Sequence, residues 1–311
     1  MTPAIAVAVA SHGRPIRLRW LLNALEEQSL PRASFEVIVV HDDDYGDLLA
    51  AHPLGATEVV APPSGPAVKR NLGWRAASAP LIAFTDNDTR PPADWLAHLV
   101  EAAERHPGAI IQGATQPDPD EAELLRTPHP RTVHVDPPTV WAETCNIAYP
   151  REVLERLGGF DEAGLPAIGG EDTDLAWRAR EAGVAYVAAP QALTFHMVEP
   201  MGLVAMARFT WRWRQLPALV KANPGLRENP VFWKTRHGWF LLALAGVLGS
   251  RRHRAALVLT LPWIRYARPL YGYGPRARLR AVAELPSQAV LDAVEVTALA
   301  VGSAQHRTLF L

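Results

Sequence analysis

Residues 81–88 of this 311-residue chain are Leu-Ile-Ala-Phe-Thr-Asp-Asn-Asp. The run Leu81–Thr85 has the apolar character and the length of a buried strand, and two aspartates follow it closely. Carboxylates two positions apart at a strand end offer hard oxygen ligands to a divalent cation. A simple turn built from Asx residues has the same composition, so the surrounding segments must distinguish a site from a turn.

The flanking segments predict alternating strands and helices. Three more apolar runs predict strands at Ala4–Ala10, Val37–Val40 and Thr57–Ala61. Three segments predict helices at Ile16–Gln28, at Ala67–Ala77 and from Pro91 to about His106. This order predicts an α/β fold with a mostly parallel central sheet covered by helices on both faces. Because ligands bind at the carboxyl ends of such strands, Asp42 and Asp86 are expected to share one crevice.

The composition favours a cytoplasmic protein with a substantial core. Hydrophobic residues make up 49% of the chain, which is enough for a well-buried interior. Cys145 is the only cysteine, which excludes an internal disulfide and agrees with a reducing compartment. The segment Met1–Val9 is apolar but lacks a basic leader and a small-residue cleavage site. It therefore predicts a first strand rather than a signal peptide.

The charge is distributed very unevenly along the chain. Residues 1–199 carry 15 Lys/Arg against 28 Asp/Glu, a net charge of −13, whereas residues 200–311 carry 16 against 4, a net charge of +12. This asymmetry predicts two parts with different roles, one over 1–199 and a basic, aromatic-rich helical extension over 200–311. The overall charge of −1 argues against nucleic acid as the main partner.

The extension has the composition of an element that lies on a membrane surface. Two apolar segments, Trp239–Leu248 and Ala255–Ile264, flank the basic run Arg251–Arg254. Each is shorter than the roughly 20 residues that cross a bilayer. Short apolar helices with basic and aromatic residues are typical of interfacial binding, here to an anionic inner face of the cytoplasmic membrane. A helical lobe packed on the acidic half, or a subunit interface, is the alternative.

Several segments, taken in order, carry a resemblance to a known family. They are Ile5–Val9 with Ser11-His12-Gly13-Arg14-Pro15 after it, Phe35–Val40 followed by acids, Lys69–Gly73, Phe84–Asp88 with Pro91–Trp95 behind it, Leu157–Glu162, and Gly170–Leu175. Over about residues 3–196 the chain resembles the family 2 glycosyltransferases of the GT-A fold. The resemblance implies a catalytic domain over 1–199 that carries out inverting, metal-dependent transfer of a single sugar from a nucleotide-diphosphate sugar to a hydroxyl acceptor, in the synthesis of cell-envelope polysaccharide. The membrane surface expected for the extension makes a lipid-linked acceptor possible.

The same resemblance implies how the acidic triplet works. Asp88 would bind a divalent cation, Mn²⁺ or Mg²⁺, directly. Asp86 would contact the ribose of the donor, or the metal through water. His196 would be the third protein ligand, and an imidazole suits Mn²⁺. Such a cation neutralises the charge that grows on a departing nucleotide diphosphate.

The remaining donor contacts are implied in the same way. Asp42 matches the residue that hydrogen-bonds the nucleobase, and Asp44 could take its place because His41-Asp42-Asp43-Asp44 departs from the usual pair of acids followed by Gly-Ser. The other expected nucleotide-sugar contacts are Ser11, Arg14, Lys69, Arg70 and Asn87. The departure leaves the base open, with UDP favoured over GDP and dTDP.

The second catalytic centre is expected at Glu171-Asp172, at the start of a helix predicted over Glu171–Ala182. Transfer to a hydroxyl needs a general base, and a carboxylate at a helix start can be aimed at the anomeric carbon. The resemblance makes Asp172 that base, with Glu171 positioning the acceptor or the base. Asn146 and Trp141 are expected to contact the acceptor.

Two other functions compete with glycosyl transfer. A sugar-1-phosphate nucleotidyltransferase shares the α/β layout but needs a glycine-rich, basic loop after the first strand, where Ser11–Arg14 supplies a single glycine. A non-catalytic protein that binds nucleotide-sugars or scaffolds at a membrane is the alternative of a different class.

Overall fold

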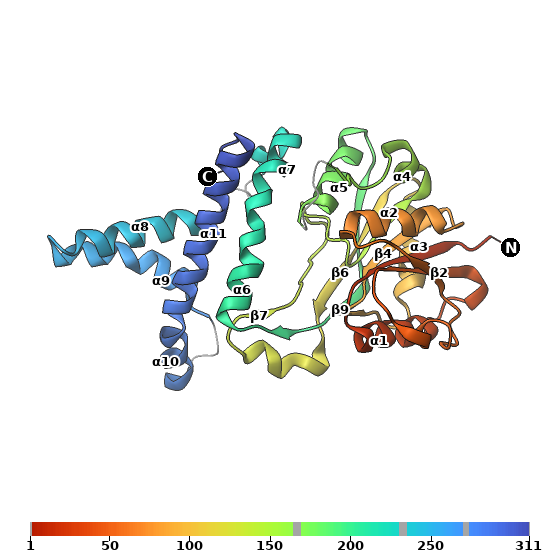
Figure 1. Ribbon diagram of the computed structural model, residues 1–311, viewed down its shortest axis with the longest axis horizontal. Coiled ribbons are helices and arrows are strands. Elements are labelled where there is room, and N and C mark those ends of the chain that lie inside the picture. The colour runs from red at the N-terminus through yellow and green to blue at the C-terminus, as the bar shows by residue number, and fades with distance from the viewer. Residues whose placement is uncertain (1, 164–168, 230–234, 270–273, 311) are drawn as a thin grey trace. The chain divides into compact units, whose positions relative to one another are not determined.

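The computed structural model describes residues 2–163, 169–229, 235–269 and 274–310 (Figure 1). The chain divides into two compact units. The first comprises Met1–Leu125 and Arg131–Glu199, and the second comprises Arg126–Pro130 and Pro200–Leu311. The short strands β7 (Pro130–Arg131) and β10 (Glu199–Pro200) pair with each other where the chain passes between the units.

The first unit is built on an eight-stranded sheet with the order β3-β2-β1-β4-β8-β6-β9-β5. Its strands are β1 (Ile5–Ser11), β2 (Phe35–His41), β3 (Thr57–Val60), β4 (Leu81–Asp86), β5 (Thr89–Arg90), β6 (Ile110–Pro117), β8 (Ile147–Pro150) and β9 (Tyr186–His196). The first four long strands run parallel, whereas β8 is antiparallel to both of its neighbours and β5 is antiparallel to β9. The sheet, which was expected to be mostly parallel, is therefore mixed in its second half.

Helices cover both faces of this sheet, as expected for an α/β fold. They are α1 (Pro15–Glu26), α2 (Pro66–Ala76), α3 (Trp95–Arg105), α4 (Arg151–Leu157) and α5 (Glu171–Glu181), with the short 3₁₀ turns η1 (Arg32–Ser34), η2 (Gly46–Leu48) and η3 (Pro119–Arg126).

Alternation along the strands explains how the two faces are filled. On β1, Ile5, Val7 and Val9 belong to one apolar cluster together with residues of α1 and α3. Ala6 and Ala8 belong to the other cluster, which contains residues of α2, α4 and α5. Both clusters are almost completely buried, so the sheet is a rigid platform for the loops at its carboxyl edge.

The predicted element boundaries agree closely with this arrangement, with one exception. The helix expected from Pro91 begins at Trp95, the start of α3. In between, β5 lies beside β9 at the end of the sheet. The two-residue strand β5 is too short for an apolar pattern to reveal it.

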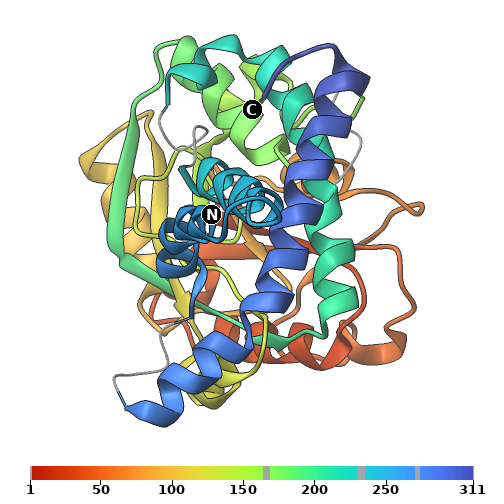
Figure 2. The ribbon, with the colours of Figure 1, turned by 90° about the vertical axis from the view of Figure 1, so that its left-hand side faces the viewer.

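The second unit is helical (Figures 1 and 2). Its elements are α6 (Leu203–Thr210), η4 (Trp211–Gln215), α7 (Leu216–Ala222), η5 (Pro224–Glu228), α8 (Thr235–Gly249), η6 (Arg254–Thr260), α9 (Leu261–Ala267), α10 (Pro275–Ala283) and α11 (Leu285–His306). The long helix α11 packs against α6 and α7, and a Cβ at its Gly302 would overlap the backbone of Arg214. This glycine permits the close approach of the two segments.

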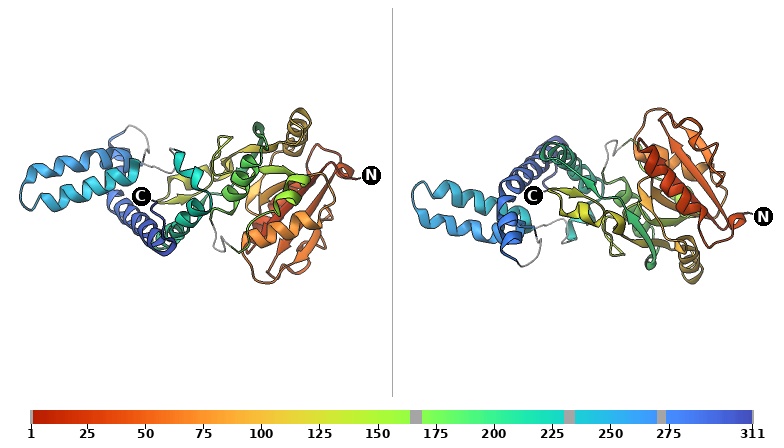
Figure 3. Two further views of the ribbon diagram at one scale, coloured as in Figure 1. Left: turned by 90° about the horizontal axis from the view of Figure 1, so that it is seen from above. Right: turned by 90° about the horizontal axis from the view of Figure 1, so that it is seen from below.

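Within the second unit, α8 and the segment η6–α9 lie side by side as a helical hairpin, drawn in light blue in Figure 3. The basic run Arg251–Arg254 lies at the turn between them. Among the described residues, no helix has both the length and the apolar character that a membrane crossing requires.

Candidate active site

The topology brings three strand ends to one edge of the sheet. In the parallel pairing, Ser11 at the end of β1 lies beside His41 of β2, and Ala10 lies beside Asp86 of β4. The loops that follow β1, β2 and β4 therefore leave the sheet together. This edge is where an open α/β sheet binds its ligands.

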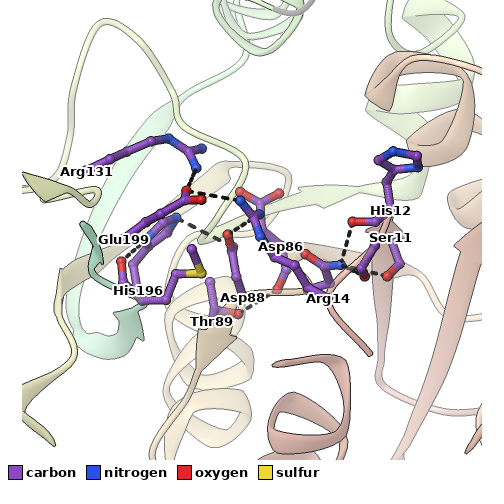
Figure 4. A network of polar contacts seen from close by, with 12 residues as sticks. Ser11, His12, Arg14, Asp86, Asp88, Thr89, Arg131, His196 and Glu199 are labelled. Carbon is purple, nitrogen blue, oxygen red and sulfur yellow. Dashed lines mark hydrogen bonds and ion pairs between the residues drawn. The ribbon is translucent and has the colours of Figure 1, made fainter. Parts of the chain in front are cut away.

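A three-residue cluster at this edge has the composition of a metal site. The ligand atoms of Asp86, Asp88 and His196 all lie within 4.8 Å of one another. His196 reaches the cluster because the antiparallel pairing of β5 with β9 places it opposite Thr89 (Figure 4). Asp88 and His196 are buried, and Asp86 is partly exposed.

The tautomer of His196 decides whether it can bind a cation. Its Nδ1 lies 2.9 Å from the carbonyl oxygen of Met197, which can only accept a hydrogen bond, so Nδ1 carries the proton. In the neutral ring, Nε2 then presents a lone pair toward Asp88 Oδ1, 3.5 Å away. Two buried acceptors that face each other need a cation between them or a second proton on the ring. The oxygen and nitrogen donor set therefore suits Mn²⁺ or Mg²⁺.

Arg14 contacts the same carboxylate from the loop after β1. Its Nη1 donates to Asp88 Oδ2 at 2.7 Å, and its Nη2 donates to Glu199 at 3.2 Å (Figure 4). Glu199 also accepts a hydrogen bond of 2.8 Å from Arg131. Arg14, at the start of α1, has the left-handed backbone conformation, with a φ of 57°. The predicted donor residue Arg14 therefore lies directly at the metal cluster, together with Glu199, which the sequence pattern did not single out.

Asp42 is held by three donors. Lys69 Nζ lies 2.5 Å from Asp42 Oδ1, His12 Nδ1 lies 2.9 Å from the same oxygen, and the backbone N–H of Ser64 donates to Oδ2 at 3.2 Å. Burial by itself would raise the pKa of Asp42, but these hydrogen bonds outweigh it and hold the pKa well below its usual value. Asp42 therefore offers a permanently ionised acceptor, which is the form that a nucleobase N–H requires.

Lys69 lies beside Asp42, the residue expected at the nucleobase. It is 3% exposed, and besides Asp42 it contacts the carbonyl oxygen of Ser11 at 2.9 Å. Its charge is thus committed to a buried pair that joins α2 to the ends of β1 and β2.

Ser11 and Asn87 brace the loop after β1. Asn87 Nδ2 donates to Ser11 Oγ at 2.9 Å and to the carbonyl oxygen of Gly13 at 3.2 Å, and both side chains are buried. Tyr45, which sequence reasoning missed, donates to the same carbonyl at 2.9 Å. Asp44 is exposed and accepts a hydrogen bond from the backbone N–H of Gly46 within its own turn. Asp42 is thus bonded to Lys69 at this edge of the sheet, whereas Asp44 is bonded within its own turn.

A buried arginine connects the metal cluster to the acidic pair of α5. Arg70 on α2 donates to Glu171 Oε1 at 2.8 Å through Nη1 and to Asp86 Oδ1 at 3.2 Å through Nη2. Burial lowers the pKa of Arg70, but the charges of Asp86, Glu171 and Asp172 outweigh this and raise it. The guanidinium of Arg70 thus bonds to both Asp86 and Glu171, which are 85 positions apart in the sequence.

Asp172 lies next to this bridge at the start of α5. Burial, followed by the charge of Glu171, raises the pKa of Asp172 to about 8, although Arg70 and the N–H of Thr173 act in the opposite direction. The Thr173 N–H lies 2.9 Å from Asp172 Oδ1 and fixes the carboxylate on the first turn. A carboxylate with this pKa accepts a proton far more readily than an exposed aspartate.

The two predicted acceptor residues have different positions. The backbone oxygen of Trp141 accepts a hydrogen bond of 2.8 Å from Thr173 Oγ1, so the Trp141 loop is tied to α5 beside Asp172. Asn146 is 1% exposed, and both N–H groups of its amide are used by the carbonyl oxygens of Ala114 and Ala192. The expectation that Asn146 contacts the acceptor is therefore corrected: its amide holds β6 and β9 to the loop before β8.

Comparison with known proteins agrees with this architecture. Residues 6–158 match the family model described as "Glycosyl transferase family 2". A validoxylamine A glucosyltransferase of Streptomyces hygroscopicus is 27% identical over 222 residues, which cover 58% of this chain and 52% of the relative. A pre-mycofactocin glycosyltransferase of Mycobacterium tuberculosis is 30% identical over 217 residues, covering 62% and 42%. These matches identify residues 6–158 as a glycosyltransferase family 2 domain.

Solved structures establish the fold of the chain. The mannosyltransferase PcManGT from Pyrobaculum calidifontis, in complex with GDP-Man and Mn²⁺, superimposes with a TM-score of 0.61 at 21% identity, covering 97% of this chain and 87% of that one. S. aureus TarS 1–349 in complex with UDP superimposes with a TM-score of 0.50 at 16% identity, covering 96% and 91%. The predicted family and the GT-A fold with a C-terminal helical region are thus confirmed. The chain spans about half the length of the curated relatives that it matches.

Proposed function

We propose that the protein is an inverting glycosyltransferase that moves a single hexose from a nucleotide-diphosphate sugar to a hydroxyl acceptor with the help of a divalent cation. The observation that carries this proposal is the buried Arg70, which hydrogen-bonds Asp86 of the metal cluster and Glu171 of the acidic pair. This link supports a single site in which the leaving group and the attacking hydroxyl meet.

The metal would be held by Asp88, Asp86 and His196. The chemistry that a bound divalent cation supplies here is neutralisation of the charge on the departing diphosphate. The donor set and the fixed tautomer of His196 support this assignment. Arg14 and Arg70, each bonded to one carboxylate of the cluster, would contribute further positive charge beside the diphosphate.

The carboxylate of Asp172 would take the proton from the acceptor hydroxyl during transfer. Asp172 accepts the proton of the acceptor hydroxyl while the hydroxyl oxygen forms a bond to the anomeric carbon. The bond from that carbon to the phosphate oxygen breaks on the opposite side, and the nucleotide diphosphate leaves with the electron pair. The elevated pKa of Asp172 supports this role because a base is most efficient when its pKa lies near the working pH. Glu171, fixed by Arg70 and by the N–H of Gly169, would position the acceptor or the base.

Asp42 would read the nucleobase. Its ionised carboxylate can accept the ring N–H that uracil presents, and UDP is the donor nucleotide that we favour. Guanine also carries a ring N–H, so Asp42 alone does not separate the two bases. The structural neighbours bind UDP, UDP-GlcNAc or GDP-Man.

The experiment that tests this function measures donor binding and product together. Thermal shift with UDP-, GDP- and dTDP-sugars should give a Mn²⁺-dependent rise in Tm with one nucleotide, UDP being expected. Chromatography of the reaction should then show release of the nucleoside diphosphate. Release of pyrophosphate from a nucleoside triphosphate and a sugar 1-phosphate would instead identify a nucleotidyltransferase. Binding without any turnover across the acceptors tried would favour a non-catalytic protein.

For the second unit we propose peripheral binding at the anionic inner face of the cytoplasmic membrane, where a lipid-linked acceptor would be available. Its helical hairpin exposes Trp239, Leu241, Leu244, Val247 and Leu248 on α8 and Leu257, Val258, Leu259 and Leu261 on η6 and α9. Arg251, Arg252 and Arg254 lie at or beside the turn. Apolar surface next to clustered arginines is the composition that binds anionic headgroups.

Liposome flotation tests the membrane proposal. The protein should float with vesicles that contain anionic lipid at low salt and should remain in solution with purely zwitterionic vesicles. Failure to float with anionic vesicles, combined with a concentration-dependent mass in light scattering, would identify the hairpin as a subunit interface.

A further inference from the structure

A cavity of about 540 Å³ lies in the first unit among α1, the segment after β5, the start of η3 and β9. Its volume is within the range of sites for small molecules. Trp20 and Phe195 supply aromatic surface, Arg90 and Asp118 supply an ion pair, and Asn23 and Glu27 supply polar groups. The proposed transfer reaction uses none of these six residues.

This cavity is separate from the donor site because neighbouring residues of a strand point to opposite sides. Phe195 and His196 are consecutive on β9. His196 belongs to the metal cluster, whereas Phe195 lines the cavity. The strand itself therefore lies between the two.

The aromatic wall is exposed and held in place. Trp20 is 43% exposed even though the guanidinium of Arg17 lies over its ring, 4.7 Å from the centroid. A cation over an indole fixes the orientation of the ring, and the remaining surface is open to a ligand. The apolar C–H face of a sugar ring packs well on such a surface.

The polar groups of the cavity favour a ligand that carries hydroxyl groups over an anionic ligand. Four carboxylates and one guanidinium line it, and Arg90 is already paired with Asp118 at 2.6 Å and with Asp120 at 2.7 Å. A phosphate or carboxylate ligand would meet net negative charge and no uncommitted cation among the lining residues that the structure describes. Hydroxyl groups, in contrast, donate well to the exposed carboxylates of Glu27 and Asp120.

The amide of Asn23 is oriented by its neighbours. His52 Nδ1 accepts a hydrogen bond from the backbone N–H of Leu54, so His52 Nε2 carries the proton and donates to Asn23 Oδ1 at 3.0 Å. Since the side-chain oxygen of Asn23 accepts this hydrogen bond from His52, the amide N–H groups of Asn23 remain as donors to a ligand. The cavity thus offers an aromatic face, carboxylate acceptors and amide donors together.

We propose that this cavity binds an uncharged saccharide unit at a second site, distinct from the donor site. The six residues named above form the site, with Trp20 as the stacking surface. The binding of a sugar here does not require the proposed transfer reaction, so each can be tested without the other.

Saturation-transfer NMR with neutral disaccharides tests the site, using maltose, cellobiose and N,N′-diacetylchitobiose, with glucose 1-phosphate as the anionic comparison. At least one disaccharide should bind, and glucose 1-phosphate should not. Trp20→Ala should weaken binding at least about tenfold, equivalent to ~1.4 kcal/mol. Ile16→Ala, which removes another exposed apolar side chain of α1, is the matched control and should bind as the wild type does.

Two further measurements make the result decisive. Asn23→Asp, which replaces the amide donors by an acceptor without changing the shape, should also weaken binding, and both variants should keep the wild-type Tm. UDP with Mn²⁺ should not displace the disaccharide. The proposal is overturned if no disaccharide binds, if Trp20→Ala binds normally, or if UDP displaces the sugar, since displacement would place the sugar in the donor site.

Discussion

The edge of the sheet in the first unit and the helical hairpin of the second unit differ in how far their charged side chains are exposed. In the first unit, Lys69 and Arg70 are buried and paired with carboxylates at the edge of the sheet. In the second, the arginines at the turn of the hairpin are exposed beside exposed Val247 and Leu248. Buried pairs fix side chains for chemistry, whereas exposed charge and apolar surface remain available to a partner. The difference predicts that substitutions in the first unit alter stability and metal binding, and that those in the hairpin alter association.

The largest change in stability is expected at Arg70. Arg70→Ala leaves Glu171 buried without its cation, and breaking a buried pair costs about 3–5 kcal/mol. Urea unfolding measures this loss. Arg75→Ala, on the same helix but in an exposed pair with Glu162, should cost at most about 1 kcal/mol. If the two variants lose equal free energy of unfolding, the ion pair of Arg70 contributes no more than an exposed surface pair does.

The next effect is on metal affinity. Asp88→Asn removes a charged ligand from the cluster and should weaken Mn²⁺ binding by at least about 100-fold, or ~2.8 kcal/mol, in calorimetry. Asp120→Asn, which removes an exposed carboxylate of the same unit, should leave Mn²⁺ affinity unchanged. If both variants bind Mn²⁺ as the wild type does, the cation lies elsewhere.

A pH-dependent effect on stability is expected from Asp172. Its pKa of about 8 in the folded protein exceeds the ordinary value of 3.8, so the folded state binds the proton more tightly than the unfolded state does. The contribution to stability is complete below about pH 4 and is lost as the pH rises through 8. Asp172→Asn should therefore raise the Tm at pH 8, by about 2–4 °C for each kcal/mol.

The control for this effect is the exposed Asp94, whose replacement by Asn should not produce the same gain at pH 8. The Tm difference for Asp172→Asn should vanish near pH 4. A Tm of Asp172→Asn that equals the wild-type value at both pH values would contradict the raised pKa.

The smallest effect is expected in the hairpin. Arg251→Gln should weaken binding to anionic vesicles by about 1 kcal/mol, roughly fivefold, because each basic residue near such a surface contributes that much. Arg105→Gln, at an exposed position of α3 in the first unit, should have no effect on flotation. Flotation that is the same for Arg251→Gln and the wild type would assign the exposed apolar surface to another partner.

The sequence predicted those features that local patterns control. The apolar run Leu81–Thr85 and the two acids after it were placed correctly because strand length and alternation are local properties. The antiparallel position of β8 was not predicted, since strand order depends on contacts between distant segments. The two-residue strand β5 carries too little pattern to be recognised.

The hydrogen-bond partners of side chains were harder to predict from the sequence than the positions of strands and helices. Arg14 lies 74 residues from Asp88 in the sequence and yet shares a hydrogen bond with it. Lys69 was expected to contact the nucleotide-sugar, and its small exposed fraction and its pairing with Asp42 are properties of the folded protein alone. For Asn146, the resemblance implied an acceptor contact, whereas its amide is used by two backbone carbonyl groups. Such partners are set by packing, which a single sequence does not display.

The central claim is that Asp172 is the base of a site whose other end is the metal cluster. The most direct test compares donor binding and transfer in the wild type and in Asp172→Asn. The variant should keep Mn²⁺-dependent binding of the nucleotide-sugar while its kcat falls by about 10²–10⁴-fold, the usual contribution of a general base. Transfer at the wild-type rate by Asp172→Asn would contradict the account.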